Sequence, residues 1–213
     1  MLKRYLASSA TKRHQFLAAN KELIQYQATA GQEPTALLVT CVDSRILPSK
    51  LFDSAPGELL TLRNIANTIP PYIHSDIATS STIEFAVNTL GIPNIIICGH
   101  TDCGGIKALD SRDQLNLIKY PSLNRWLDLI APAKRDIAEK LEGLSDQERH
   151  LAIVEQNIRN QIDNLLTYPF IRDKVALGHD HLRLHGLIYD LHIPGFRILD
   201  HDTRKFRIFV DNQ

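Results

Sequence analysis

Residues 36–45 read ALLVTCVDSR, an apolar run that ends in a thiol, a carboxylate and a guanidinium. An apolar run of this length, closed by polar residues, is typical of a buried strand that opens into a loop. In parallel α/β sheets, ligands bind in the crevice beyond the carboxyl ends of the strands. Taken alone, the stretch fits two readings equally well: a functional strand end at Cys41, Asp43 and Arg45, or a buried cysteine followed by a surface ion pair.

A second strand end of the same kind favours the functional reading. The apolar run IIIC at residues 95–98 is followed by GHTDCGG at residues 99–105. If the two strands are neighbours in one parallel sheet, Cys41, His100 and Cys103 converge at its edge. Two thiolates and one imidazole suit Zn²⁺, and catalytic zinc typically takes three protein ligands and leaves a fourth position for water. The paired strand ends therefore predict a zinc site.

The composition is that of a soluble globular protein, with 44% apolar and 23% charged residues in 213, and we expect one domain over residues 1–213. Basic and acidic residues balance at 24 each, which excludes an electrostatic footprint for nucleic acid or an anionic membrane. No apolar stretch approaches the roughly 20 residues of a membrane helix, and residues 1–13 lack the apolar core of a signal peptide. Together with the odd number of cysteines, three, these features predict a cytoplasmic protein.

Hydrophobic periodicity predicts the remaining elements. Residues 2–29 predict one or two helices, within an N-terminal helical arm over residues 1–30 that either a partner subunit or the chain's own domain could cover. Further helices are predicted over residues 81–90 (N-cap Ser80 or Ser81), 104–109, 123–141 and 145–167, with a loop over 110–122. Further strands are predicted over residues 59–62, 182–191, 195–199 and 206–210. This alternation predicts an α/β fold with a central, mostly parallel sheet, flanking helices and C-terminal edge strands.

A group of histidines near the C-terminus offers a second candidate metal site. Its members are His179, His181, His185, His192 and His201. They fall in different predicted elements and have no cysteine partners, so we interpret them as surface or hydrogen-bonded residues. Cys98 lies inside a predicted strand and should point away from Cys103.

Three motifs carry a resemblance to a known family: CVDSR at residues 41–45, RNIAN at 63–67 and GHTDCGG at 99–105. With these motifs the sequence resembles the β-class carbonic anhydrases. Likeness to the plant-type branch extends through three further segments. These are PGE at residues 56–58, IPPY at 69–72 and NLLTYPF at 164–170. The resemblance covers roughly residues 30–200.

The resemblance implies a zinc enzyme that converts CO₂ and water reversibly to bicarbonate and a proton, by attack of zinc-bound hydroxide. It implies that Cys41, His100 and Cys103 bind one zinc ion per chain. It also implies that Asp43 and Arg45 form the catalytic pair of the family. The enzyme is expected to assemble as a dimer or tetramer, with its sites near the subunit boundary.

The resemblance also implies a substrate site that includes Gln32 as the substrate-binding glutamine, together with Ile65 and Gly104. Two positions depart from the plant-type pattern, because Leu60 stands where a phenylalanine is usual and Phe85 where a tyrosine is usual. A lost hydroxyl removes one possible hydrogen bond, worth about 0.5–1.5 kcal/mol net. The departures therefore bear on substrate positioning and rate rather than on the zinc chemistry.

The family fills the fourth zinc position in two ways, with water or with the aspartate itself as a fourth ligand in a closed state. Bacterial members with a regulatory bicarbonate site commonly carry a tryptophan three residues before the first cysteine, where this chain has Leu38. Together with the plant-type likeness, this predicts an open site in which Asp43 pairs with Arg45 near neutral pH. We expect the regulatory pocket to be absent or altered.

Two other functions remain open at this point. The same zinc site could serve a hydrolase of a CO₂-like molecule such as CS₂ or COS, which should show a narrowed or blocked pocket. It could also stabilise a non-catalytic binding module. A structural zinc site needs a fourth protein ligand and no orienting pair, so Asp43 and Arg45 argue against the module.

Overall fold

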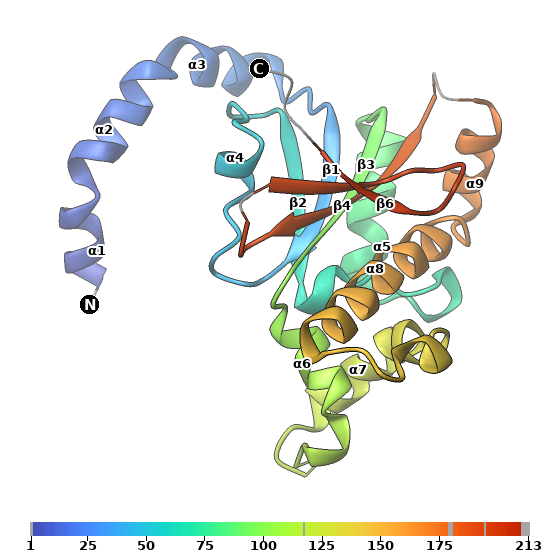
Figure 1. Ribbon diagram of the computed structural model, residues 1–213. Helices are drawn as coiled ribbons and strands as arrows, with labels where there is room; N and C mark the ends of the chain where they lie inside the picture. Colours follow the sequence, from blue (N-terminus) through green and yellow to red (C-terminus); the bar gives the residue numbers. More distant parts are fainter. Residues whose placement is uncertain (1, 117, 179–180, 194, 210–213) are drawn as a thin grey trace.

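One six-stranded sheet forms the centre of the molecule. The computed structural model describes residues 2–116, 118–178, 181–193 and 195–209. The strands are β1 (Ala36–Cys41), β2 (Leu59–Asn64), β3 (Asn94–His100), β4 (Arg183–Asp190), β5 (Gly195–Leu199) and β6 (Phe206–Ile208). Their order is β2-β1-β3-β4-β5-β6, with the first four parallel and the last two antiparallel (Figure 1). The predicted fold class is therefore confirmed; Val210, in the predicted last strand, lies outside the described residues.

Helices make up most of the rest of the described chain. The α-helices are α1 (Leu2–Ser8), α2 (Ala10–Ala19), α3 (Lys21–Ala30), α4 (Pro48–Leu51), α5 (Ile77–Glu84), α6 (Gly104–Asp110), α7 (Pro121–Arg135), α8 (Asp146–Leu165) and α9 (Pro169–Ala176). Short 3₁₀ helices span Ile65–Asn67, Tyr72–His74, Arg112–Gln114 and Ala138–Leu141, and a π-helix spans Phe85–Thr89. Within the described residues, no helix combines the length and the apolar character needed to cross a membrane.

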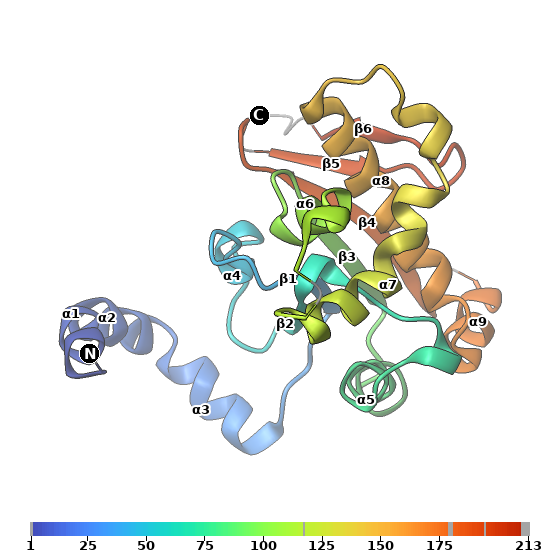
Figure 2. The same cartoon turned by 90° about the horizontal axis from the view of Figure 1, so that it is seen from below.

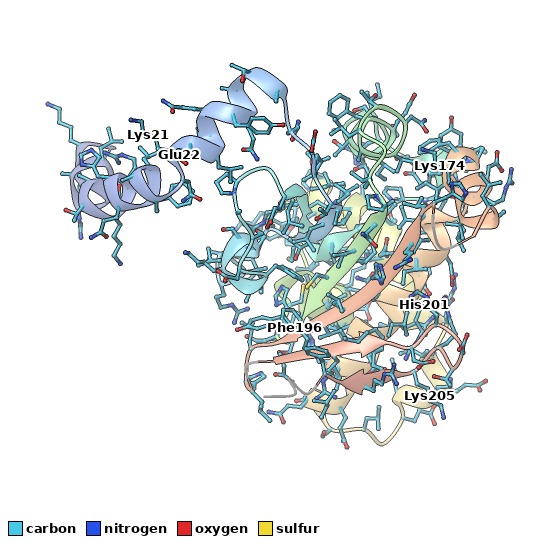
Figure 3. The ribbon with its side chains drawn as sticks, turned by 90° about the horizontal axis from the view of Figure 1, so that it is seen from above. Lys21, Glu22, Lys174, Phe196, His201 and Lys205 are labelled. Carbon is cyan, nitrogen blue, oxygen red and sulfur yellow. The ribbon has the colours of Figure 1, made fainter. Side chains whose placement is uncertain are left out.

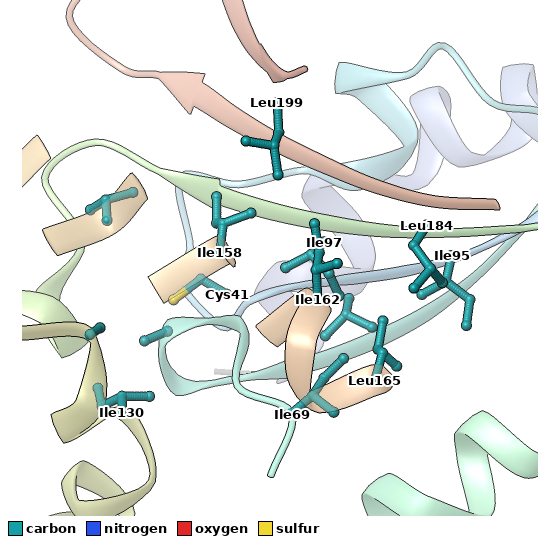
Figure 4. Close-up of a cluster of buried hydrophobic side chains, with 14 of the residues drawn as sticks. Cys41, Ile69, Ile95, Ile97, Ile130, Ile158, Ile162, Leu165, Leu184 and Leu199 are labelled. Atoms are coloured by element: carbon teal, nitrogen blue, oxygen red, sulfur yellow. The ribbon is translucent and has the colours of Figure 1, made fainter. Parts of the chain in front are cut away.

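The main core lies on one face of the sheet. Alternate side chains of β1 and β3 point to this face and are fully buried against α8 (Figure 4). They are Leu37, Val39, Ile95 and Ile97, and they meet Ile158, Ile162 and Leu165. Each such buried side chain stabilises the fold by about 1.5–3 kcal/mol. On the opposite face, residues of all six strands line an open cavity of about 750 Å³ beside Phe52.

The N-terminal arm stands apart from this core. It consists of three helices rather than the one or two expected, because breaks occur at Ser9 and at Asn20, whose amide donates to the Phe16 carbonyl. No residue of α2 or α3 is buried, and Phe16 and Tyr26 are 50% and 60% exposed. Figures 2 and 3 show the arm projecting away from the sheet. The chain's own domain therefore leaves the apolar side chains of α2 and α3 accessible.

The structure moves the start of the helix that was expected over residues 81–90. The helix expected over residues 81–90 begins at Ile77, because the Asp76 carboxylate accepts the backbone N–H of Thr79 and caps the helix instead of Ser80 or Ser81. Beyond Glu84 the chain continues as a π-helix to Thr89.

Prolines account for the helices that were not predicted. Pro48 and Pro169 lie outside the helices predicted from the sequence, but each is the first residue of a helix, α4 and α9. Proline suits that position, because the first N–H of a helix has no intrahelical partner and the ring presets φ. The same placement of Pro121 starts α7 two residues before the predicted boundary. The helices predicted over residues 123–141 and 145–167 correspond to α7 and α8, but α7 ends at Arg135 and is followed by the 3₁₀ helix Ala138–Leu141. The loop predicted over residues 110–122 is shorter, because α6 ends at Asp110 and α7 starts at Pro121; its described residues contain the 3₁₀ helix Arg112–Gln114.

Close packing at the start of α6 generates a stability prediction. A Cβ added at Gly105 would lie 2.6 Å from Ile65 Cγ2 and 3.1 Å from Ala66 Cβ, whereas one added at Gly104 would meet nothing within 4 Å. Gly105→Ala should therefore lower the free energy of unfolding by about 1–3 kcal/mol, because the extra carbon overpacks a buried contact. Gly104→Ala is the matched control and should not lower it. Urea unfolding at one fixed protein concentration measures both, and equal losses would contradict the packing argument.

Candidate metal centre and active site

Three metal-ligating side chains converge at the carboxyl edge of the sheet. Cys41 ends β1 and His100 ends β3, and these strands are parallel neighbours. Cys103 follows three residues later, directly before α6. Each residue offers one donor atom, which is Sγ for the two cysteines and a ring nitrogen for His100. These three atoms lie within 4.8 Å of one another, and all three residues are buried. The predicted convergence is therefore present.

The donor atoms fit a tetrahedral metal ion. The Sγ atoms of Cys41 and Cys103 are 3.9 Å apart, and two thiolates about 2.3 Å from a tetrahedral zinc lie about 3.8 Å apart. His100 Nδ1 lies 2.8 Å from the Thr101 carbonyl oxygen, so Nδ1–H donates and Nε2 carries the free lone pair. That Nε2 is buried without a hydrogen-bond partner. A metal ion would satisfy this atom.

The two thiols perturb each other. The hydrogen bond from the Cys103 thiol lowers the pKa of Cys41 below the usual thiol range, despite burial. The same contact, together with burial, raises the pKa of Cys103. Without metal, the contact therefore favours one thiolate that accepts a hydrogen bond from the other, still protonated thiol. Since both must be thiolates to bind a metal, metal binding at neutral pH releases a proton.

Asp43 and Arg45 form a bidentate pair beside this centre. Arg45 Nε donates to Asp43 Oδ1 at 2.9 Å, and its Nη2 donates to Oδ2 at 2.8 Å. The Arg45 side-chain hydrogen bonds hold the pKa of Asp43 well below its usual range, so the carboxylate is ionised at neutral pH. Asp43 Oδ2 also lies 3.9 Å from His100 Nε2. The carboxylate is thus held next to the metal position.

Asp102 adds a second carboxylate to the guanidinium, a contact that the sequence did not reveal. Arg45 Nη1 donates to Asp102 Oδ2 at 2.7 Å, and Arg45 Nη2 donates to the Asp102 carbonyl at 3.0 Å. Lys107 Nζ donates to the other carboxylate oxygen of Asp102. Arg45 first, and Lys107 second, lower the pKa of Asp102 to about 2. The one sequence feature that could have pointed to Asp102 is its position between His100 and Cys103.

Two further side chains hold the backbone of the site. Arg63, which was quoted in a motif but given no role, donates to the carbonyls of Cys41 at 2.9 Å and Asp43 at 2.8 Å. His150, which sequence reasoning missed, accepts the backbone N–H of Cys103 on Nε2 at 3.1 Å. Burial lowers the pKa of His150, which favours the neutral acceptor form. Arg63 and His150 therefore fix the backbone around Cys41, Asp43 and Cys103.

Amide side chains of α8 fix the neighbouring loop. Asn157 donates to the Ala66 carbonyl at 3.0 Å. Gln161 accepts the N–H of Ile69 at 2.6 Å, and Asn164 donates to the carbonyl of the same residue at 2.7 Å. This connection runs past the metal ligands, so α8 fixes the wall of the site.

A small cavity of about 260 Å³ opens beside Cys41 and Asp43. It is lined by Cys41, Val42, Asp43, Ile65, Gly104, Gly105, Ala108 and Leu123. Apart from Asp43 its lining is largely apolar, which suits a small uncharged molecule. Two of the residues expected at the substrate site, Ile65 and Gly104, lie in this wall.

Three other residues expected at the substrate site are not brought to the cavity by the described chain. Leu60 pairs with Leu37 in the first half of β1, well before Cys41. Gln32 precedes β1, so the length of that strand, about 3.3 Å per residue, separates it from Cys41. Phe85 starts the π-helix and is 47% exposed. In one chain these side chains lie outside the pocket.

The other cysteine and the C-terminal histidines do not form a second metal cluster within the described residues. Cys98 is buried, and burial raises its pKa to about 12. His185 lies 3.1 Å from Asn94 Oδ1 and packs edge-on against His201, the latter labelled in Figure 3. His179 lies outside the described residues.

Comparisons with known proteins agree with this geometry. A sequence model of the carbonic anhydrase family matches residues 36–194. A carbonic anhydrase of Pseudomonas aeruginosa is 36% identical over 88% of this chain and 83% of its own length. The mitochondrial β carbonic anhydrase 6 of Arabidopsis thaliana is 35% identical over 84% of this chain, which spans 63% of that longer protein.

Solved structures show the same likeness. The β-carbonic anhydrase CcaA superposes with a TM-score of 0.91 at 29% identity, over 98% of this chain and 99% of that one. A structure from a study of two tetrameric β-carbonic anhydrases from Sordaria macrospora has a TM-score of 0.81 at 28% identity, over 93% and 96% of the two chains. The chain therefore belongs to the β-class carbonic anhydrases, the family of enzymes that interconvert CO₂ and bicarbonate.

Proposed function

We propose that this enzyme hydrates CO₂ at a zinc ion held by Cys41, His100 and Cys103. The observation that carries the proposal is the free, buried Nε2 of His100 facing two thiols beside an ionised carboxylate. Zinc bound here would supply a hydroxide nucleophile, because zinc lowers the pKa of its bound water, to about 7 where three histidines hold the metal.

The residues of the chain orient the reactants. The apolar cavity wall accommodates CO₂, which has no charge to be solvated. Asp43 is held ionised next to the metal position, so it can accept a hydrogen bond from the nucleophile and turn a lone pair toward the carbon atom. Arg45 occupies both oxygens of Asp43 and so keeps that carboxylate from serving as a metal ligand. This supports an open site near neutral pH.

We also propose that a second copy of the chain completes each site, in a dimer or tetramer. Gln32, Leu60 and Phe85 lie outside the cavity of their own chain, although the family resemblance assigns them to the substrate site. The exposed apolar residues of the arm need a cover, and the related Sordaria macrospora enzymes are tetrameric. The whole of residues 1–213 would then act as one domain with an exchanged arm.

The remaining alternatives and the cellular location follow from the same features. A hydrolase of CS₂ or COS is not favoured, because a cavity of about 260 Å³ is present beside Cys41 and Asp43. A zinc-stabilised module is not favoured, because the metal cluster found among the described residues has three members rather than four. Balanced charge and three free cysteines support a cytoplasmic location, with CO₂ and bicarbonate rather than nucleic acid or membrane as partners.

Zinc content and activity should be lost together when a ligand is removed. Cys103→Ser should lose most of its zinc and its CO₂ hydration activity, because only two ligands remain. Cys98→Ser changes a buried cysteine outside the cluster and is the matched control, which should keep both. Metal analysis and stopped-flow CO₂ hydration on zinc-loaded protein measure the two quantities. Full zinc occupancy in Cys103→Ser would contradict the ligand assignment, and zinc-loaded wild type without hydration activity would contradict the proposed reaction.

The open site predicts a simple pH dependence. Activity should fall smoothly as pH drops through the pKa of the zinc-bound water, because protonation removes the hydroxide nucleophile. Asp43 should not contribute between pH 5 and 9, since its lowered pKa keeps it ionised throughout. A crystal structure of the zinc-loaded enzyme near pH 7 should show Asp43 on Arg45. An Asp43 oxygen about 2.0–2.2 Å from zinc would instead establish a closed site.

Assembly predicts a mass of at least twice 24.0 kDa in sedimentation experiments. Replacing Phe16 and Tyr26 together by serine should shift the protein toward smaller species, because both are exposed apolar residues of the arm. Lys12→Ser changes an exposed polar residue of the same arm and is the control. It should leave the mass unchanged. An active wild-type monomer would contradict the proposal.

A further inference from the structure

The orientation of the Asp43 carboxylate depends on a single residue. Every side-chain and backbone group found to donate to its carboxylate belongs to Arg45: the backbone N–H, Nε and Nη2. Arg45 itself is 46% exposed. An exposed arginine–carboxylate pair alone contributes only about 0–1 kcal/mol, which is a weak constraint on a long side chain. Something else must fix the guanidinium.

Asp102 supplies that second anchor. Its carboxylate accepts Arg45 Nη1 at 2.7 Å and its carbonyl accepts Nη2 at 3.0 Å. The guanidinium therefore lies between two carboxylates, with one edge on Asp43 and the next on Asp102. Planar, forked contacts of this kind fix direction as well as distance.

The anchor is itself rigidly placed. Asp102 has φ +60, in the left-handed region, which aspartate tolerates better than most residues. It lies between His100 and Cys103, and the backbone of the latter is held by His150. Lys107, on α6, binds the carboxylate oxygen that Arg45 leaves free. Asp102 therefore cannot follow Arg45 if that side chain moves.

We propose that Asp102 is a positioning residue for CO₂ hydration, which holds Arg45 in place and through it keeps Asp43 directed at the nucleophile and off the metal. The proposal rests on the zinc-dependent reaction proposed above and adds a residue outside the paired Asp43 and Arg45. Asp43 Oδ2 lies only 3.9 Å from His100 Nε2, so a carboxylate released by Arg45 needs little movement to reach the metal.

Two substitutions separate the charge of Asp102 from its backbone role. Asp102→Asn keeps the shape, one acceptor oxygen and the tolerance for positive φ, but removes the charge. Asp102→Gly removes both side-chain contacts and accommodates the backbone without strain. The effect should be larger for glycine than for asparagine. Because glycine also leaves Lys107 without its partner, Lys107→Met serves to measure that contribution separately.

Asp110 provides a matched control. Like Asp102, it accepts one arginine and one lysine, Arg149 Nη2 at 2.7 Å and Lys134 Nζ at 3.0 Å. The two carboxylates are similarly exposed, 26% for Asp110 and 29% for Asp102. Asp110→Asn therefore removes the same kind of ion pair without touching Arg45.

The first test is the crystal structure of each zinc-loaded variant near pH 7. In Asp102→Gly we expect Arg45 to leave its bidentate position and Asp43 to turn toward the metal in some or all sites. In Asp110→Asn and Lys107→Met both residues should stay as in wild type. Unchanged Arg45 and Asp43 in Asp102→Gly would overturn the proposal. This readout does not depend on activity, so it separates a failure of the proposal from a failure of the assigned reaction.

The second test is a double-mutant cycle on kcat/KM for CO₂ hydration. In the wild-type background, Asp102→Gly should lower kcat/KM about fivefold and Asp102→Asn about twofold, the upper part of the range for losing a well-oriented but partly exposed charged contact. In an Arg45→Ala background, Asp102→Gly should cost less than about twofold, because its effect passes through Arg45. Equal losses in both backgrounds would show a general structural role and overturn the proposal.

Discussion

The parallel pairing of β1 with β3 is the constraint on which the metal site depends. Parallel strands end at the same edge of a sheet, so the residues that follow them meet in one crevice. The pleat then selects which side chains face the core, and a slip of one residue would turn Cys41 to the opposite face. Burial of Leu37, Val39 and Ile97 fixes that register. The chemistry of the site is thus a by-product of how the core packs.

The site is also preorganised, because each group near the metal is held by a second group behind it. His100 is oriented through Nδ1 by the Thr101 carbonyl, and Cys103 through its N–H by His150. Arg63 fixes the carbonyls of Cys41 and Asp43. Such outer contacts set the tautomer and direction of a ligand before metal or substrate arrives.

Sequence reasoning succeeded where a local pattern decides the structure. Apolar runs closed by polar residues predicted the strand ends, and with them the convergence of Cys41, His100 and Cys103. It failed where several residues could have started a helix. Asp76 rather than Ser80 or Ser81 caps α5, and Pro169 starts α9. It also failed where a contact between distant residues decides the structure. The contact between Asp102 and Arg45 joins residues 57 apart, and no spacing rule reveals it. Only the folded sheet shows that Gln32 lies at the wrong end of β1 for its own site.

The long helix α8 links the metal site to the centre of the fold. Its His150 accepts the backbone N–H of Cys103, and its Asn157 donates to the carbonyl of Ala66 in the adjoining loop. Its Ile158 and Ile162 are buried against the sheet. Opening the site locally would require lifting this helix and exposing those side chains, which costs nearly as much as unfolding the domain. Amide protons around the ligands should therefore exchange with solvent only through global unfolding.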